Sequence, residues 1–136
     1  MTTSDHIVRD HKPVTLLGGG EVFEGDIGAA LTLAPTCVAA DSGAALALAA
    51  GVELAAVIGD FDSAPAEVLA RIPSERCHRV AEQESTDFGK ALTRIDAPLV
   101  LGVGFTGARL DHQLAAFNTL AAYPDRPCIL LGAHEI

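Results

Sequence analysis

Aromatic residues and paired cysteines are scarce in this sequence. Its 136 residues include no tryptophan, 1 tyrosine and 5 phenylalanines. Alanine, leucine and valine must therefore fill most of the core, as they do where helices pack on a parallel sheet. No Cys-x-x-Cys pair suggests zinc binding or redox catalysis. We expect buried, reduced thiols in a cytosolic protein at the three isolated cysteines, Cys37, Cys77 and Cys128.

Basic residues are also few. Only 9 basic residues accompany 18 acidic ones, which gives a net charge of −9. This balance argues against nucleic acid or an anionic membrane surface as a partner. An anionic substrate such as a nucleotide would need local help from a metal ion, lysine and arginine. No apolar run approaches the ~20 residues that cross a bilayer. The polar N-terminus lacks the apolar region of a signal peptide, so we expect a cytoplasmic protein.

Apolar runs and helical patterns alternate along the chain. Strands are predicted at Val14–Leu17, Thr36–Ala40, Leu54–Ile58, Cys77–Val80, Leu99–Val103 and Cys128–Leu131. Helices are predicted at Ile27–Leu33, Ala44–Ala50 with Gly51 as C-cap, a short stretch from Pro65, Thr86–Ile95 with Ser85 as N-cap, and Asp111–Ala122. The alternation predicts an α/β fold, with an open, mostly parallel, Rossmann-like sheet of about six strands and helices on both faces.

The segment Gly59-Asp60-Phe61-Asp62-Ser63 directly follows a predicted strand. Gly59 would allow a sharp turn at the strand end. In extended backbone, residues two apart point to the same side, so Asp60 and Asp62 would face one point while Phe61 anchors the loop in the core. Two carboxylates at a strand end suit Mg²⁺, which fills its other positions with water or phosphate oxygens. The alternative is a polar turn with solvated acids.

Other charged residues also follow predicted strands. Asp41 ends the second strand, and Asp87 lies in the first helical turn after the fourth. Arg109 and Asp111 lie beyond the glycine-rich loop at 102–107, after the fifth strand. These connections share the carboxyl edge of an open parallel sheet, where ligands bind. Random surface acids would not fall selectively after strands, so we expect a functional cluster at this edge.

Four segments carry a resemblance to a known family: Ala40-Asp41-Ser42-Gly43-Ala44, Gly59-Asp60-Phe61-Asp62-Ser63, Gln83-Glu84-Ser85-Thr86-Asp87-Phe88-Gly89-Lys90-Ala91-Leu92 and Gly107-Ala108-Arg109-Leu110-Asp111-His112. In order and spacing they resemble thiamine pyrophosphokinase (thiamine diphosphokinase), in its nucleotide-binding α/β domain. The resemblance covers most of the chain from Gly18 onward. It implies Mg²⁺-dependent transfer of a pyrophosphoryl group from ATP to the hydroxyl of thiamine, giving thiamine diphosphate and AMP.

The resemblance also implies roles for single residues. The catalytic candidates are Asp41, Asp60, Asp62 and Asp87, of which the last three are the metal candidates. Asp41 and Asp87 match family positions at the metal–substrate centre, where either could bind the metal or orient the thiamine hydroxyl. The candidates for binding nucleotide and substrate are Gln83, Thr86, Lys90, Arg109, Asp111 and His112.

Each of these residues has a structural alternative. Asp87 could serve as a partner of the helix dipole. Lys90 lies one helical turn from Asp87 on the same face and could pair with it instead of with phosphate. Arg109 could clamp a phosphate bidentately or form a surface ion pair. The remaining alternatives are a helix cap for Asp111, a packed or capping residue for His112 and a solvated loop amide for Gln83.

The chain departs from the family pattern in two ways. Ser42, Ala45, Glu82, Glu84 and Ala116 replace residues more usual in the family, which bears on fine nucleotide contacts. Family members also continue into a β-rich second domain that helps to bind thiamine and to form a dimer. We therefore expect residues 1–131 to be the nucleotide-binding catalytic domain and residues 132–136 to begin that second domain. A homodimer is expected of the full-length protein, whereas residues 1–136 alone are expected to bind Mg-nucleotide weakly and thiamine hardly at all.

The sequence also offers alternatives for one glycine segment and for the function. Gly18-Gly19-Gly20 could bring backbone amides close to a phosphate or simply form a tight turn; it is no P-loop, because no Gly-Lys-Ser/Thr follows. A receiver-type signalling domain would also be a small α/β unit with Mg²⁺, but its acidic pair would follow the first strand, where this chain has glycines. A nucleotide-binding regulatory module without catalysis is the other alternative.

Overall fold

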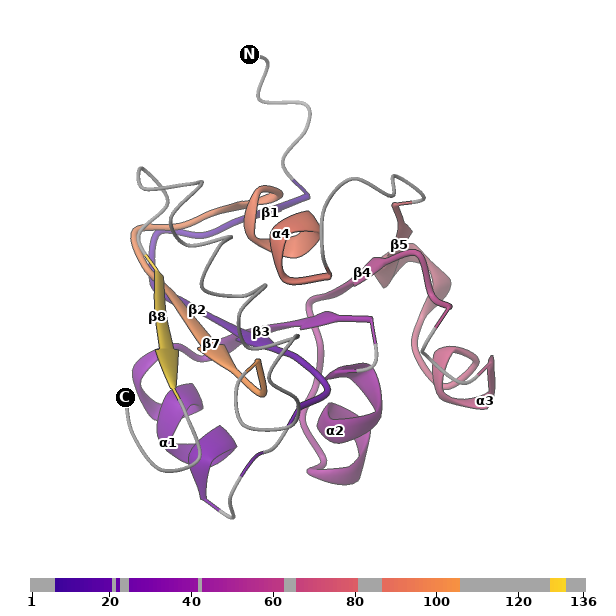
Figure 1. Ribbon diagram of the computed structural model, residues 1–136, viewed down its shortest axis with the longest axis horizontal. Helices are drawn as coiled ribbons and strands as arrows, with labels where there is room; N and C mark the ends of the chain where they lie inside the picture. Colours follow the sequence, from indigo (N-terminus) through magenta and orange to yellow (C-terminus); the bar gives the residue numbers. More distant parts are fainter. Residues whose placement is uncertain are drawn as a thin grey trace.

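The computed structural model describes residues 7–20, 22, 25–41, 43–62, 66–80, 87–105 and 128–131 (Figure 1). Its centre is a six-stranded sheet in the order β5-β4-β3-β2-β7-β8, in which every pair is parallel. The strands are β2 (Val14–Leu17), β3 (Thr36–Ala40), β4 (Ala56–Gly59), β5 (Cys77–Arg79), β7 (Val100–Val103) and β8 (Cys128–Leu131). The predicted α/β fold with a parallel sheet of six strands is confirmed.

The two faces of the sheet bury different residues of the same strands. On β2 and β3, Leu16 and Val38 belong to one apolar cluster, while Leu17 and Cys37 belong to the other. The strands are buried on both sides, as expected of parallel strands covered by helices. Thr15 is also fully buried, and its hydroxyl donates to the Ala34 carbonyl at 2.8 Å.

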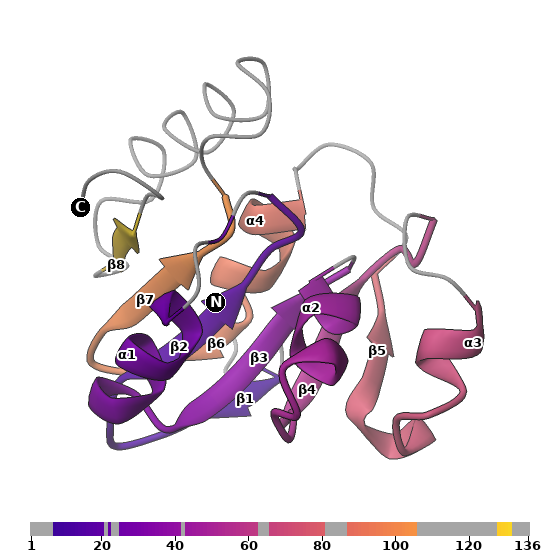
Figure 2. The ribbon, with the colours of Figure 1, turned by 90° about the horizontal axis from the view of Figure 1, so that it is seen from below.

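Helices cover both faces of the sheet, as predicted. Figures 1 and 2 show α4 (Asp87–Leu92) on one face and α1 (Asp26–Leu33) with α2 (Gly43–Ala49) on the other. The α4 face is apolar because Phe88, Ala91 and Leu92 pack into the same cluster as Leu16 and Val38. The four-residue α3 (Ala66–Leu69) contacts α2, and a 3₁₀ turn at Ser74–Arg76 leads into β5. No helix in the described ranges is long and apolar enough to cross a membrane.

The end of α2 confirms the predicted cap at Gly51. Gly51 has a φ of 72°, in the left-handed region that glycine enters without steric cost. Its N–H donates to the Leu48 carbonyl at 3.1 Å, and the next N–H, from Val52, donates to the Ala47 carbonyl at 2.9 Å. These two bonds form a Schellman motif, which satisfies helix carbonyls that would otherwise lack partners.

The helix predicted over Thr86–Ile95 is too long at its C-terminal end. It ends at Leu92, and the Arg94 guanidinium donates to the Lys90 carbonyl at 3.0 Å across its last turn. Ile95 instead belongs to β6 (Ile95–Asp96), which pairs in parallel with β1 (Val8–Arg9) in a separate two-stranded sheet. Ile95 is 2% exposed and joins the apolar cluster below α4, so core packing rather than helical periodicity decides its place.

Candidate active site

Asp41 and Asp60 meet at the carboxyl edge of the sheet. They follow the neighbouring strands β3 and β4, and the Asp41 N–H donates to the Ile58 carbonyl at 3.0 Å. Asp41 is fully buried and has a φ of 46°, a left-handed conformation that aspartate tolerates better than most residues. A Cβ on Gly59 would lie 3.1 Å from the Cβ of Asp41, so the missing side chain of Gly59 makes room for this approach.

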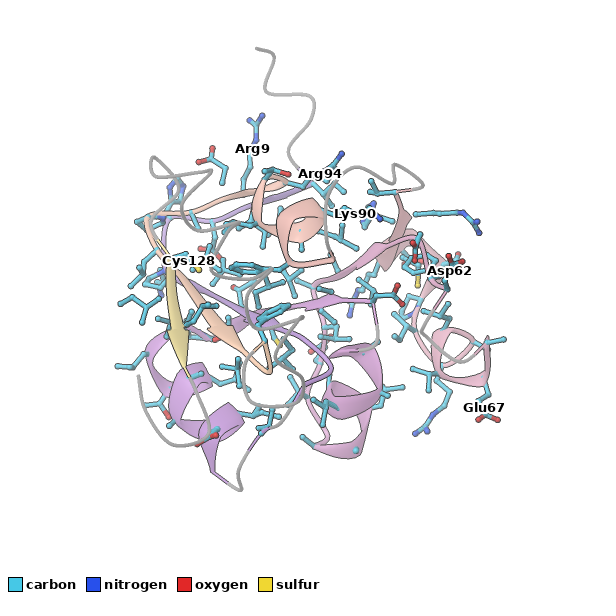
Figure 3. All side chains as sticks on the ribbon, in the orientation of Figure 1. Arg9, Asp62, Glu67, Lys90, Arg94 and Cys128 are labelled. Carbon is cyan, nitrogen blue, oxygen red and sulfur yellow. The ribbon has the colours of Figure 1, made fainter. Side chains whose placement is uncertain are left out.

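The loop after β4 is a turn and not the extended segment expected from the sequence. Phe61 has a φ of 68°, and the Asp62 N–H donates back to Asp60 Oδ1 at 3.0 Å. Strand alternation therefore does not explain the position of the two acids, although both belong to one tight loop. Phe61 packs against the apolar cluster on the α1 and α2 face, as its predicted anchoring role requires. Asp62 is exposed beyond the end of β4 (Figure 3).

Lys90 lies on α4, beside the β4 edge of this site (Figure 3). Its Nζ lies 3.5 Å from Asp60 Oδ2, and the side chains of the two residues are 3% and 14% exposed. Phe88 and Leu92 on the same helix are buried in the core, which fixes the helix over β3 and β4. The sequence predicted that Lys90 would lie near carboxylates, but it did not identify Asp60 as the partner.

The contacts of Asp60 favour its ionised form. Its pKa lies below the usual value, first because the carboxylate accepts the Asp62 backbone N–H, and then because of the neighbouring Asp41 carboxyl group. The Lys90 ammonium lowers the pKa of Asp60 further, by charge attraction and by a hydrogen bond, whereas burial opposes these effects. The lowered pKa keeps Asp60 in its ionised form, which is the form that binds a cation.

The glycine segment after β2 packs against the loop after β7. Its Gly18 N–H donates to the Val103 carbonyl at 2.7 Å, and its Gly20 N–H donates to the Gly104 carbonyl at 2.6 Å. A Cβ on Gly18 would lie 2.6 Å from Cε1 of Phe105, so the segment allows a close approach of two loops. Since two of its amides are engaged in this way, the structure favours the tight-turn interpretation of Gly18-Gly19-Gly20 over direct contact with phosphate.

The chemistry of Asp41 and Asp60 fits Mg²⁺. Both offer hard oxygen atoms, and Lys90 shows that a positive charge is accommodated beside Asp60. Within the described ranges, no three acidic, histidine or cysteine side chains lie close enough together to hold a metal ion. Two carboxylates are nevertheless enough for Mg²⁺, which commonly completes its shell with water and substrate phosphates.

Several predicted site residues or their side chains lie outside the described residues. Asp87 begins α4, but its side chain lies outside the described residues. The same holds for all atoms of five other candidates, Gln83, Thr86, Arg109, Asp111 and His112, and for the predicted helix at 111–122. Sequence reasoning overlooked Gly43, where a Cβ would collide with the Leu17 carbonyl. In the sequence, only the run of small residues around Ser42 and Gly43 indicated this close packing.

The comparison with known families decides the membership of this chain. The family described as "Thiamin pyrophosphokinase, catalytic domain" matches residues 28–130, more than half of the sequence and the part that holds Asp41, Asp60 and Lys90. The chain belongs to the thiamin pyrophosphokinase family. The resemblance found in the sequence motifs is thereby confirmed. No curated protein matches the chain at the sequence level.

Solved structures of this family have the same fold. The thiamin pyrophosphokinase of Geobacillus thermodenitrificans is 30% identical, with a TM-score of 0.71 over 87% of this chain and 58% of its own. A thiamin pyrophosphokinase family protein of Enterococcus faecalis is 25% identical, with a TM-score of 0.64 over 89% of this chain and 62% of its own. The Candida albicans thiamin pyrophosphokinase, at 14% identity, shares the fold with a TM-score of 0.71 over 91% of this chain and 61% of its own. The chain thus spans about three fifths of the length of these relatives.

Proposed function

We propose that this chain carries the catalytic centre of a thiamine diphosphokinase. The reaction is transfer of a pyrophosphoryl group from ATP to the thiamine hydroxyl, giving thiamine diphosphate and AMP. Membership of the thiamin pyrophosphokinase family supports the reaction class. The observation that carries the proposal is the meeting of Asp41, Asp60 and Lys90 at the carboxyl edge of the sheet, where open α/β sheets bind ligands.

Phosphoryl-group transfer depends mainly on positioning and on neutralising charge. Asp60, with Asp41 beside it, would hold Mg²⁺, and the ion would supply charge neutralisation for the phosphates. Asp62 and Asp87 are further proposed ligands, and Asp41 or Asp87 would orient the thiamine hydroxyl. The proposed contacts to nucleotide and substrate are those given by the family motifs: Gln83, Thr86, Lys90, Arg109, Asp111 and His112. We further propose a cytoplasmic homodimer for the full-length protein.

Asp60→Asn tests the metal assignment. The substitution keeps the shape of the side chain but removes the charge that a divalent cation requires. In the full-length protein, AMP release from ATP in the presence of thiamine should therefore fall by at least about a hundredfold, as for loss of a key electrostatic group. Thermal melting should show a folded protein. Asp96→Asn is the matched control, because Asp96 is an exposed acid on β6, outside the site, and activity should stay unchanged.

The assay also separates the alternatives. AMP and thiamine diphosphate must appear together and in equal amounts; a receiver-type domain or a non-catalytic nucleotide-binding module would produce neither. Activity of Asp60→Asn near that of the unmodified full-length protein at saturating Mg²⁺ would reject Asp60 as the metal ligand. Neither the described residues nor the comparisons favour one of these alternatives over the kinase.

A further inference from the structure

The Lys90 ammonium lies beside the Asp60 carboxylate, to which Mg²⁺ is also proposed to bind. Its ammonium lies 3.5 Å from Asp60 Oδ2, and its side chain is only 3% exposed. An ammonium in such a position is not a solvated surface charge, because removing it from water is costly unless a nearby anion compensates. Among the residues that the structure describes, the anion that compensates the Lys90 ammonium is Asp60.

A divalent metal and Lys90 cannot use Asp60 equally well at the same time. Mg²⁺ demands short, direct contacts with oxygen, and two cations that share one carboxylate repel each other strongly in a site with little water. Lys90 has a flexible four-carbon stem, whereas Asp60 is held by the Asp62 backbone N–H at 3.0 Å. The lysine is therefore the partner that can move.

Building on the proposed function, we propose that Lys90 is an exchangeable counter-ion: metal binding displaces its ammonium from Asp60, and the released ammonium binds a phosphate of the nucleotide. A displaced, buried ammonium needs a new anion, and a polyphosphate bound next to the metal supplies one. Metal and nucleotide then strengthen each other's binding, since coupling between two ligands is reciprocal. Lys90 is in this role a positioning residue for the metal and a binding residue for the nucleotide.

The exchange predicts opposite effects of one substitution on the two ligands. In the full chain without nucleotide, at pH 8, Lys90→Met should bind Mn²⁺ about tenfold more tightly than the unmodified chain, because the competing charge is gone. At saturating Mg²⁺, the same variant should bind α,β-methylene-ATP about tenfold or more weakly, as for loss of a charged hydrogen bond. Titration calorimetry measures both affinities, and electron paramagnetic resonance of free Mn²⁺ checks the first.

The sequence offers a matched control, since its only other lysine is the exposed Lys12. Lys12→Met makes the same chemical change and the same change in net charge, so general electrostatic attraction of Mn²⁺ would affect both variants alike. Its affinity for both ligands should stay within about twofold of the unmodified chain. Lys90→Arg keeps the charge and should retain the weaker Mn²⁺ binding. Lys90→Gln gives the same test if Lys90→Met does not melt cooperatively.

The outcomes are distinct. Equal Mn²⁺ affinities for Lys90→Met and Lys12→Met would overturn the exchange, even if nucleotide binding weakened, since Lys90 would then serve phosphate alone. Tighter Mn²⁺ binding with unchanged nucleotide affinity would overturn the second half, in which Lys90 moves to phosphate. The proposed reaction fails separately: a full-length protein that binds both ligands as expected but forms no thiamine diphosphate refutes the kinase and leaves the exchange standing.

Discussion

Asp10 shows how a single side chain can join segments that are distant in sequence. It lies between β1 and β2, where its Oδ1 accepts the Lys12 N–H at 2.9 Å and its Oδ2 accepts the Thr36 hydroxyl at 2.6 Å. Thr36 begins β3, so the carboxylate ties the approach to β2 to the neighbouring strand. The pKa of Asp10 is lowered mainly by the Thr36 hydroxyl and next by the Lys12 N–H.

The lowered pKa of Asp10 predicts a pH-dependent contribution to stability. A carboxyl group with a lower pKa in the folded state stabilises the fold above its usual pKa of 3.8, and this contribution is lost as the pH falls through the folded-state pKa. Thr36→Val should therefore lower the free energy of unfolding at neutral pH, and the difference should shrink as the pH falls below the usual pKa of 3.8. Urea unfolding at several pH values measures it.

Thr32→Val is the control for this experiment. The Thr32 hydroxyl donates to the Gly28 carbonyl at 2.9 Å, and a carbonyl does not titrate, so the effect of that substitution should not vary with pH. If the effects of Thr36→Val and Thr32→Val had the same pH dependence, the Asp10 contact would not contribute as described.

Single residues also mark the limit of reasoning from sequence alone. The position of Asp41 and Asp60 at one edge followed from the rule that carboxyl ends of parallel strands lie together. The pairing of Lys90 with Asp60 did not follow, because a helical pattern identifies neighbours only within its own helix, such as Asp87. The left-handed backbone conformation of Phe61 was not predicted either, since residues other than glycine seldom adopt a positive φ.

At the scale of elements, two glycines in helices have opposite roles. Gly43 opens α2 against β2, where an added Cβ would collide with the Leu17 carbonyl and lie 2.7 Å from the Leu17 carbonyl carbon. Gly28 lies within α1, and a Cβ there would meet nothing within 4 Å. The same residue type is thus required by close packing in one helix and is replaceable in the other.

We expect Gly43→Ala and Gly28→Ala to change stability in opposite directions. Gly43→Ala forces backbone apart in a packed core and should lower the free energy of unfolding by about 1–3 kcal/mol. Gly28→Ala should raise it by about 0.4–1 kcal/mol, because alanine restricts the unfolded chain and suits a helix. Urea unfolding of both variants, followed by circular dichroism, measures these changes. If Gly43→Ala were as stable as the unmodified chain, α2 could move away from β2 with little loss of free energy of unfolding.

Elements with a strong pattern were predicted best. The bounds of β2, β3 and β8 agree with prediction because each is an apolar run with clear breaks at its ends. β4 begins at Ala56, two residues later than predicted, although Leu54 is buried as expected. β1 and β6 were missed, because two-residue strands carry no periodicity, and the error at Ile95 arose from the same pairing.

At the scale of the whole molecule, the sheet separates two apolar clusters, and the cysteines report on different parts of it. Cys37 lies on β3, is 1% exposed and belongs to the cluster on the α1 and α2 face. Burial raises the pKa of its thiol to about 12. Cys77 lies on β5, at one end of the described strand order, and is only partly buried. Burial raises the pKa of Cys77 as well, but its position leaves it within reach of solvent.

Thiol labelling should therefore distinguish local opening from global unfolding. At pH 8, a thiol with a pKa of about 12 is about one part in ten thousand thiolate, the form that reacts, so Cys37 should be inert to iodoacetamide until the sheet opens. Cys77 should be modified first in native buffer. Peptide mapping by mass spectrometry across a urea series, compared with circular dichroism, should show Cys37 labelled only in step with global unfolding, because helix packing and strand pairing enclose it together. Labelling of Cys37 well before the loss of secondary structure would mean that α1 and α2 leave the sheet as a separate unit, and that the two faces do not unfold cooperatively.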